Sequence, residues 1–215
     1  MKKVYIYKAY ERFWHWSQAF LIFFLAFTGF EIHGSFVFFG YQNAVTYHNM
    51  AAISFLILIV FTMFWHFSTG EWKQYIPTFT NIKAQINYYL IGIFSKAPHP
   101  TRKTELTKLN PLQKLVYFGL KVLLIPLLAI SGLLYMYYRY EDGGQVKSLD
   151  IDGLSGIASA HTLGALLLIA FVIVHLYLIT TGTTVFSNLK AMLTGYEEIE
   201  NDEEEKNSGE KDFID

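Results

Sequence analysis

The sequence contains no cysteine. This absence excludes disulfide bridges, iron–sulfur clusters held by thiolates, and covalent attachment of haem through a C-x-x-C-H motif. A glycine-rich dinucleotide-binding fingerprint and a phosphate-binding loop are also missing. Any redox chemistry in this protein must therefore use a cofactor that is bound without a covalent link.

Charged residues are scarce, at 16% of 215 residues, whereas 53% are hydrophobic and 18% are aromatic. This composition is too apolar for a soluble domain of this size and predicts an integral membrane protein. The N-terminal apolar run follows a basic flank but has no small-residue cleavage site, so we expect an uncleaved first span. We predict an all-α fold, a bundle of four transmembrane helices at about residues 13–34, 45–67, 112–138 and 157–181.

Lysine and arginine are absent from the loop between the first two predicted spans. Basic residues instead precede the first span and lie between the second and the third, at Lys2, Lys3, Lys8, Arg12, Lys73, Lys83, Lys96, Arg102, Lys103 and Lys108. The positive-inside rule then predicts that both termini are cytoplasmic. We expect residues 1–196 to form the membrane domain and the acidic residues 197–215 to form a disordered tail.

Two histidines, His161 and His175, lie in the fourth span, which has no Asp, Glu, Lys or Arg. Ionisable groups are costly inside a membrane, so they are functional candidates. Fourteen residues of helix place these imidazoles about 21 Å apart and about 40° off one face. Because imidazole is a common axial ligand of haem iron, the spacing fits two stacked haems. The alternative is a pair of buried histidines that hydrogen-bond to neighbouring helices.

The predicted orientation also gives the other histidines a depth in the membrane. His15 begins the first span on the cytoplasmic side, and His48 begins the second span on the outer side. The level pairs are His48 with His161 for an outer haem and His15 with His175 for an inner haem. His66 is an alternative partner for His175. However, the helical rise from His48 to His66 is about 27 Å, whereas the rise from His161 to His175 is about 21 Å, and this mismatch favours His15.

Two basic side chains could contact a haem propionate. Arg12 lies one turn before His15, and Lys121 lies well inside the third span, where Pro126 predicts a kink. Lys121 could instead meet a quinone oxygen or extend its ammonium to the membrane interface. His33 and His99 are expected to lie at an exposed interface and in a loop.

Several segments together resemble a known family. They are Arg12–Ala19 (RFWHWSQA), His48, Leu109–Lys114 (LNPLQK), and His161 with His175–Tyr177. This combination resembles the dihaem cytochrome b subunits of Ni/Fe hydrogenases, formate dehydrogenases (gamma subunit) and thiosulfate reductases, the prokaryotic cytochrome b or b561-like family. The resemblance covers about residues 5–196.

The resemblance implies that four histidines hold two b haems in the level pairs described above. It also implies a quinone site on the cytoplasmic side, near the inner haem, to which Asn110 and Gln113 contribute. Asn110 is independently predicted as a helix N-cap with Pro111 in the first helical position. The implied location is the cytoplasmic membrane of a bacterium or an archaeon.

The predicted function is membrane electron transfer between menaquinone or ubiquinone and a periplasmic redox partner. The outer loops are short, so the catalytic centre should belong to another chain, such as a multihaem c cytochrome, an iron–sulfur protein, a hydrogenase or a molybdenum reductase. Quinol dehydrogenase or quinone reductase activity would need that partner, and no nucleic acid is expected to bind. The alternatives are a self-contained transmembrane b-type reductase and a haem-free membrane anchor or metal transporter.

Overall fold

The computed structural model describes residues 2–95, 97, 100, 108–140 and 151–199. They fall into two compact units. The bundle unit contains residues 14–77 and 114–176, and the terminal unit contains the described parts of 1–13, 78–113 and 177–215. Lys96, His99, Arg102 and Lys103, together with residues 200–215 of the predicted tail, lie outside the described residues.

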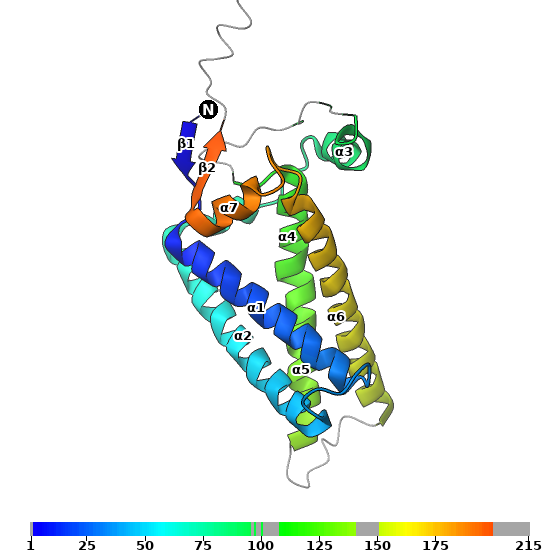
Figure 1. The fold of residues 1–215 in the computed structure, drawn as a ribbon. Coiled ribbons are helices and arrows are strands. Elements are labelled where there is room, and N and C mark those ends of the chain that lie inside the picture. Colours follow the sequence, from blue (N-terminus) through cyan, green and yellow to red (C-terminus); the bar gives the residue numbers. More distant parts are fainter. Residues whose placement is uncertain (1, 96, 98–99, 101–107, 141–150, 200–215) are drawn as a thin grey trace, which may run out of the picture. The chain divides into compact units, whose positions relative to one another are not determined.

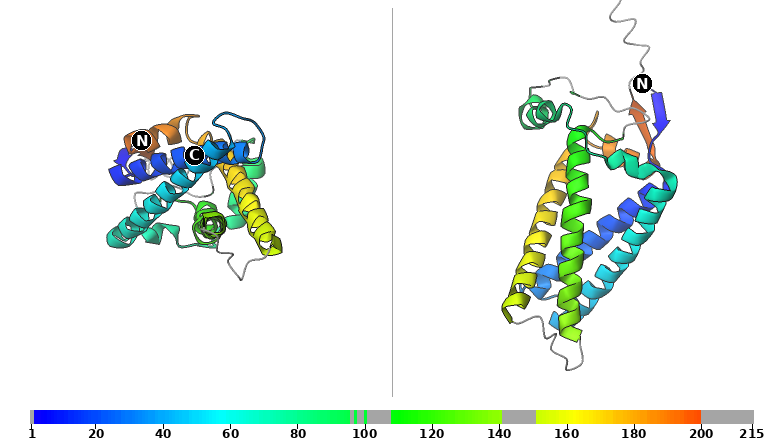
Figure 2. Two further views of the ribbon diagram at one scale, coloured as in Figure 1. Left: turned by 90° about the horizontal axis from the view of Figure 1, so that it is seen from below. Right: turned by 180° about the vertical axis from the view of Figure 1, so that it is seen from behind.

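Four helices are long and apolar enough to cross a membrane, at Ala9–Ile32, Tyr41–Thr69, Pro111–Tyr137 and Gly153–Ile179. They correspond to the four predicted spans, so a mostly helical fold with four candidate spans is confirmed, although the described residues also form a two-stranded sheet that the all-α prediction did not include. Within the bundle unit, successive spans lie side by side and run in opposite directions (Figures 1 and 2). The spans comprise α1 (Ala9–Ile32), α2 (Tyr41–Thr69), the run α4–η3–α5, and α6 (Ile151–Ile179).

The third span is not a continuous α-helix. It consists of α4 (Pro111–Gly119), a π-helical segment η3 (Leu120–Leu124) and α5 (Ile125–Tyr140). Pro126 lacks the backbone N–H that would bond to the carbonyl of Val122, so the regular ladder is interrupted at this point. The irregular segment ends two residues before the proline at which the sequence predicts a kink, and it carries Lys121.

A buried carboxylate organises the turn between α1 and α2. Glu31 is 4% exposed, and its Oε1 accepts hydrogen bonds from the backbone N–H groups of Phe38, Phe39 and Gly40 at 2.7, 2.7 and 2.8 Å. Gly40 has a φ of 80°, which side-chain-bearing residues rarely adopt. These bonds fix the point at which α2 begins, and therefore the depth of His48.

The terminal unit joins the two ends of the described chain. Strand β1 (Lys2–Tyr5) pairs antiparallel with β2 (Tyr196–Ile199), with Lys2 opposite Ile199. The predicted boundary between membrane domain and tail, at residues 196 and 197, thus falls inside β2. The unit also contains an ion pair of 2.8 Å between Lys108 Nζ and Glu11 Oε1. Its helical segments are α3 (Ile82–Asn87), η2 (Tyr88–Gly92) and α7 (Ser187–Thr194).

A candidate pair of haem sites

Two pairs of histidine rings face each other inside the bundle unit. The ring centroids of His48 on α2 and His161 on α6 are 6.3 Å apart, with the ring planes at 72°. Those of His15 on α1 and His175 on α6 are 6.2 Å apart, with the planes at 53°. The structure thus brings together the same two pairs that were paired by depth from the sequence.

The separations match those of two imidazoles bound to one iron. An imidazole nitrogen binds a metal ion at about 2 Å, and the ring centroid lies roughly 1.2 Å further on the same line. Two axial imidazoles therefore place their centroids about 6.4 Å apart. Both pairs have this spacing, so their donor chemistry and geometry fit bis-histidine coordination.

Each ring of the His48–His161 pair contacts a hydroxyl group on the helix that precedes it in the chain. Thr28 Oγ1 on α1 lies 3.0 Å from His48 Nδ1, and Ser131 Oγ on α5 lies 3.0 Å from His161 Nδ1. Both hydroxyl side chains are buried, with Thr28 0% and Ser131 5% exposed. These contacts leave Nε2 of each histidine as the nitrogen available for a metal.

A glycine follows each of these hydroxyl residues and makes room for the imidazole. A Cβ atom on Gly29 would lie 3.6 Å from His48 Cε1, which is an ordinary contact. A Cβ atom on Gly132 would lie 3.1 Å from His161 Cε1 and would require the ring to move. The absence of a side chain at Gly132 therefore helps to set the position of the His161 ring.

The His15–His175 pair has a different, mainly aromatic environment. The Phe171 ring stacks on His175 with the centroids 5.7 Å apart and the planes at 14°. Tyr117 Oη lies 3.4 Å from His175 Nδ1, a long contact for a hydrogen bond. His15 Nδ1 is buried and has no hydrogen-bond partner among the described residues. This pair therefore has weaker polar support than the His48–His161 pair.

The two remaining candidates in the bundle unit lie together in an aromatic cluster. His66 is 6% exposed, and its Nδ1 lies 2.7 Å from the carbonyl oxygen of Thr62. Its ring lies 5.5 Å from that of Trp14 and 5.2 Å from that of Tyr75. Lys121 Nζ lies 3.1 Å from the Tyr75 centroid. The structure places His15, which follows Trp14, opposite His175, and it places His66 in this cluster.

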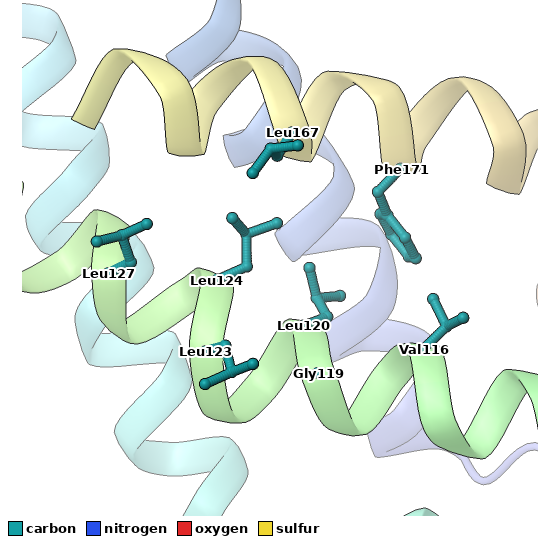
Figure 3. Close-up of a pocket in the computed structure, with 8 residues that line it drawn as sticks. All are labelled: Val116, Gly119, Leu120, Leu123, Leu124, Leu127, Leu167 and Phe171. Atoms are coloured by element: carbon teal, nitrogen blue, oxygen red, sulfur yellow. The ribbon is translucent and has the colours of Figure 1, made fainter. Parts of the chain in front are cut away.

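An apolar groove of about 360 Å³ runs between the third span and α6 (Figure 3). No lining side chain carries a charge or a hydrogen-bonding group. Phe171 is part of the wall and also stacks on His175, so the groove reaches the His15–His175 pair. The lining residues are Val116, Gly119, Leu120, Leu123, Leu124, Leu127, Leu167 and Phe171.

Asn110 and Gln113, in the terminal unit, form a capping box at the start of α4. Gln113 N–H donates to Asn110 Oδ1 at 2.8 Å, and Asn110 N–H donates to Gln113 Oε1 at 3.0 Å. Asn110 Nδ2 also donates to the hydroxyl oxygen of Tyr89 at 3.0 Å. Burial raises the pKa of Tyr89, although its hydrogen bond with Asn110 opposes the shift.

Arg12 also belongs to the terminal unit. Its Nη1 donates a hydrogen bond of 2.6 Å to the carbonyl oxygen of Leu193 at the end of α7. Its Nε is buried and has no hydrogen-bond partner among the described residues. The guanidinium thus keeps a buried Nε–H donor that the described residues do not use.

The sequence did not identify the hydroxyl groups that contact the histidines. The available signal is a hydroxyl residue followed by glycine, which occurs in the first span as Thr28-Gly29 and in the third as Ser131-Gly132. Tyr75, Tyr89 and Phe171 gave no comparable signal, because aromatic residues are common throughout this chain.

The described residues contain no cluster of three or more His, Cys, Asp or Glu side chains that could hold a metal ion. The histidines occur as facing pairs, and an ion with only protein ligands would need more donors than a pair supplies. Two axial ligands are sufficient for a haem, because the macrocycle supplies the other four. Four membrane helices with such pairs define the class of membrane-bound b-type cytochromes.

The chain belongs to the prokaryotic cytochrome b561 family, whose sequence pattern it matches over residues 6–195. It is similar to the protein named "Putative cytochrome YdhU" of Escherichia coli (strain K12), with 29% identity over 211 residues, covering 91% of this chain and 75% of the relative. No solved structure is similar enough to count as a match. The protein is thus a multi-pass membrane subunit of electron transfer that binds haem b.

Proposed function

We propose that the protein binds two b haems, one between His48 and His161 and one between His15 and His175. The observation that carries this proposal is the pair of ring separations, 6.3 and 6.2 Å, on helices that the sequence marks as membrane spans. The two pairs share α6, on which fourteen residues separate them by about 21 Å. Haem iron alternates between the ferrous and ferric states, so each site would carry one electron at a time.

The protein's own side chains hold and tune these sites. Thr28 and Ser131 contact the Nδ1 atoms of His48 and His161. Lys121 supplies a positive charge beside Trp14, the residue before His15. We assign Lys121 to the carboxylate groups of the cofactor at the His15–His175 pair, with Arg12, one turn before His15, as the second cation.

We further propose that a membrane quinone, menaquinone or ubiquinone, exchanges electrons with the protein at Asn110 and Gln113. The amide Nε2 of Gln113 has no hydrogen-bond partner among the described residues and can donate to a quinone oxygen. Asn110 fixes the position of Gln113 through the capping box, and the second N–H of its own Nδ2 is a further donor that would contact the quinone.

The electron partner is proposed to lie on the periplasmic side, with both termini in the cytoplasm. The pairing of β1 with β2 supports a common side for the two ends, because paired strands cannot be separated by a membrane. A multihaem c cytochrome, an iron–sulfur protein, a hydrogenase or a molybdenum reductase would supply the catalytic centre. The cytoplasmic membrane of a bacterium or archaeon is the corresponding location.

The test is a haem count on the protein purified in detergent. The pyridine haemochrome assay should give two b haems per chain in the wild type. His15→Ala, His48→Ala, His161→Ala and His175→Ala should each lose one spectral component, and the matched controls His66→Ala and His33→Ala should retain both. A wild type with fewer than two haems, or loss of a component in His66→Ala but not in His15→Ala, would overturn this assignment of the ligands.

A further inference from the structure

We propose that Thr28 and Ser131 are positioning residues that hold His48 and His161 in the tautomer with the proton on Nδ1, and thereby lower the midpoint potential of the haem between them. This inference rests on the proposed function, because it concerns one of the two proposed haem sites. The sequence did not identify either hydroxyl residue as a contact of the histidines.

The hydroxyl proton of Ser131 is already used within α5. Ser131 Oγ lies 2.6 Å from the carbonyl oxygen of Leu127 and 3.0 Å from His161 Nδ1. Two oxygen atoms at 2.6 Å repel each other unless a proton lies between them, so the single hydroxyl proton points to Leu127. The contact with His161 must then have Oγ as the acceptor, and Nδ1 carries a proton.

The hydroxyl proton of Thr28 is likewise used within its own helix. Thr28 Oγ1 lies 2.9 Å from the carbonyl oxygen of Phe24 and 3.2 Å from that of Leu25. The hydroxyl proton is used within α1, and Oγ1 accepts from His48 Nδ1 at 3.0 Å. Each Nε2 is therefore unprotonated and has its lone pair available, which is the tautomer that binds a metal.

This arrangement of a hydroxyl residue, a glycine and a histidine occurs twice, and both occurrences belong to the His48–His161 pair. In each case the hydroxyl residue precedes a glycine, and a histidine on the next span lies against both. In the His15–His175 pair, His15 Nδ1 has no partner among the described residues, and the Tyr117 contact is 3.4 Å long. The two sites thus differ in the support given to their Nδ1 atoms.

The direction of the effect follows from ligand chemistry. A hydrogen bond donated by Nδ1–H makes the imidazole a stronger electron donor to its metal. Stronger donation favours ferric over ferrous iron, so it lowers the midpoint potential. Removing the acceptor oxygen should therefore raise the potential of the haem at His48 and His161 and leave the other haem unchanged.

The test uses Thr28→Val and Ser131→Ala in the full-length protein, with haem content, redox titration of the α-band and electron paramagnetic resonance of the oxidised protein as readouts. Thr28→Ser and Ser131→Thr restore the acceptor. Thr46→Val and Ser54→Ala are matched controls, because these hydroxyls donate to the carbonyls of Gln42 and Met50, at 2.9 Å in each case. The affected component is identified as the one lost in His48→Ala.

We expect Thr28→Val and Ser131→Ala to retain two haems and to shift that component to a more positive potential. The expected shift is up to about tenfold in the redox equilibrium constant, or about 59 mV for one electron. Its ferric resonance signal should change, because the ligand rings are no longer held. The restoring variants should return both readouts to the wild-type values.

Unchanged potentials in both variants with two haems bound would overturn this inference alone. An equal shift in Thr46→Val or Ser54→Ala would also overturn it. If Thr28→Val or Ser131→Ala loses its haem, the restoring variant decides: retention of the haem in Thr28→Ser or Ser131→Thr supports the positioning role, and loss there contradicts it. A wild type without haem would overturn the proposed function as well.

Discussion

Lys121 Nζ lies 3.1 Å from the centroid of the Tyr75 ring and 5.2 Å from that of Trp14. An ammonium group over an aromatic face is attracted by the ring quadrupole, which partly replaces the solvation that the membrane removes. Among the described residues, no carboxylate forms an ion pair with Lys121. The described residues therefore leave this ammonium without an ionic partner, as its proposed assignment to a cofactor carboxylate requires.

Substitution of Lys121 by methionine should lower the midpoint potential of the haem proposed at His15 and His175. A nearby positive charge favours the ferrous state, so its removal favours the ferric state. The expected effect is on the order of 1 kcal/mol, the size of a charge–charge interaction at an effective dielectric constant of about 20. Redox titration checks this, with Lys114→Met as a control two turns earlier in the chain. A shift of the other haem instead would contradict it.

Alanine at Gly132 should weaken haem retention at His48 and His161, whereas alanine at Gly29 should not. The added Cβ would lie 3.1 Å from His161 Cε1 in the first case and 3.6 Å from His48 Cε1 in the second. Displacing a ligand ring from its supporting contact typically reduces affinity by about tenfold or more. The rate of haem transfer to an excess of a haem-scavenging protein measures this affinity. Equal rates in the two variants would contradict the prediction.

Asn110→Ala should lower the free energy of unfolding by about 1 kcal/mol, because it removes the N-cap of α4. Asn110→Ser keeps an acceptor for the Gln113 N–H but loses the donor to Tyr89. Asn110→Ser should therefore be more stable than Asn110→Ala by about 1 kcal/mol, because both variants lose the hydrogen bond to Tyr89 but only the serine keeps the cap. Denaturant unfolding in detergent distinguishes the two variants.

The same Asn110→Ser variant also tests the proposed quinone contact. If the Asn110–Gln113 group contacts the quinone, reduction of the haems by a menaquinol analogue should be slower in Asn110→Ser although the cap of α4 is retained. Gln113→Ala should show the same defect, because it removes the amide donor. Wild-type rates in both variants would exclude a quinone contact at this group.

The stability of the protein should decrease at alkaline pH through Tyr89. Burial raises the pKa of this phenol, so the folded protein keeps its proton at a pH at which the unfolded chain has lost it. Its contribution to stability is complete below about pH 10 and is lost as the pH rises through the folded pKa. Thermal unfolding between about pH 8 and about pH 11 should show a smaller alkaline decrease for Tyr89→Phe. Parallel curves for the two proteins would contradict this.

The spans and the facing histidines could be predicted because depth in a membrane is a one-dimensional quantity. Hydropathy gives the limits of each span, and the rise per residue gives the depth of His48, His161, His15 and His175. The rotation of each helix about its axis depends on how its neighbours pack, and neither hydropathy nor the rise per residue gives it. For this reason Thr28 and Ser131 were not identified as contacts of the histidines.

Two other features depended on contacts between distant parts of the chain. The pairing of residues 2–5 with residues 196–199 involves two short segments, and neither has a strong strand pattern. The contact of Lys121 with Tyr75 depends on the π-helical segment η3, which changes the direction of side chains along the third span. The proline at position 126 indicates an irregular helix, but not which residues the irregular turn contains.

The ladder between β1 and β2 links the order of synthesis to the order of assembly. A ribosome completes β1 first and β2 only after all four spans have been made. The backbone groups of β1 therefore have no strand partner during nearly the whole of translation. A chain that stops before residue 196 cannot close the ladder. An unpaired β1 therefore distinguishes a nascent or truncated chain from one that has been translated past residue 199.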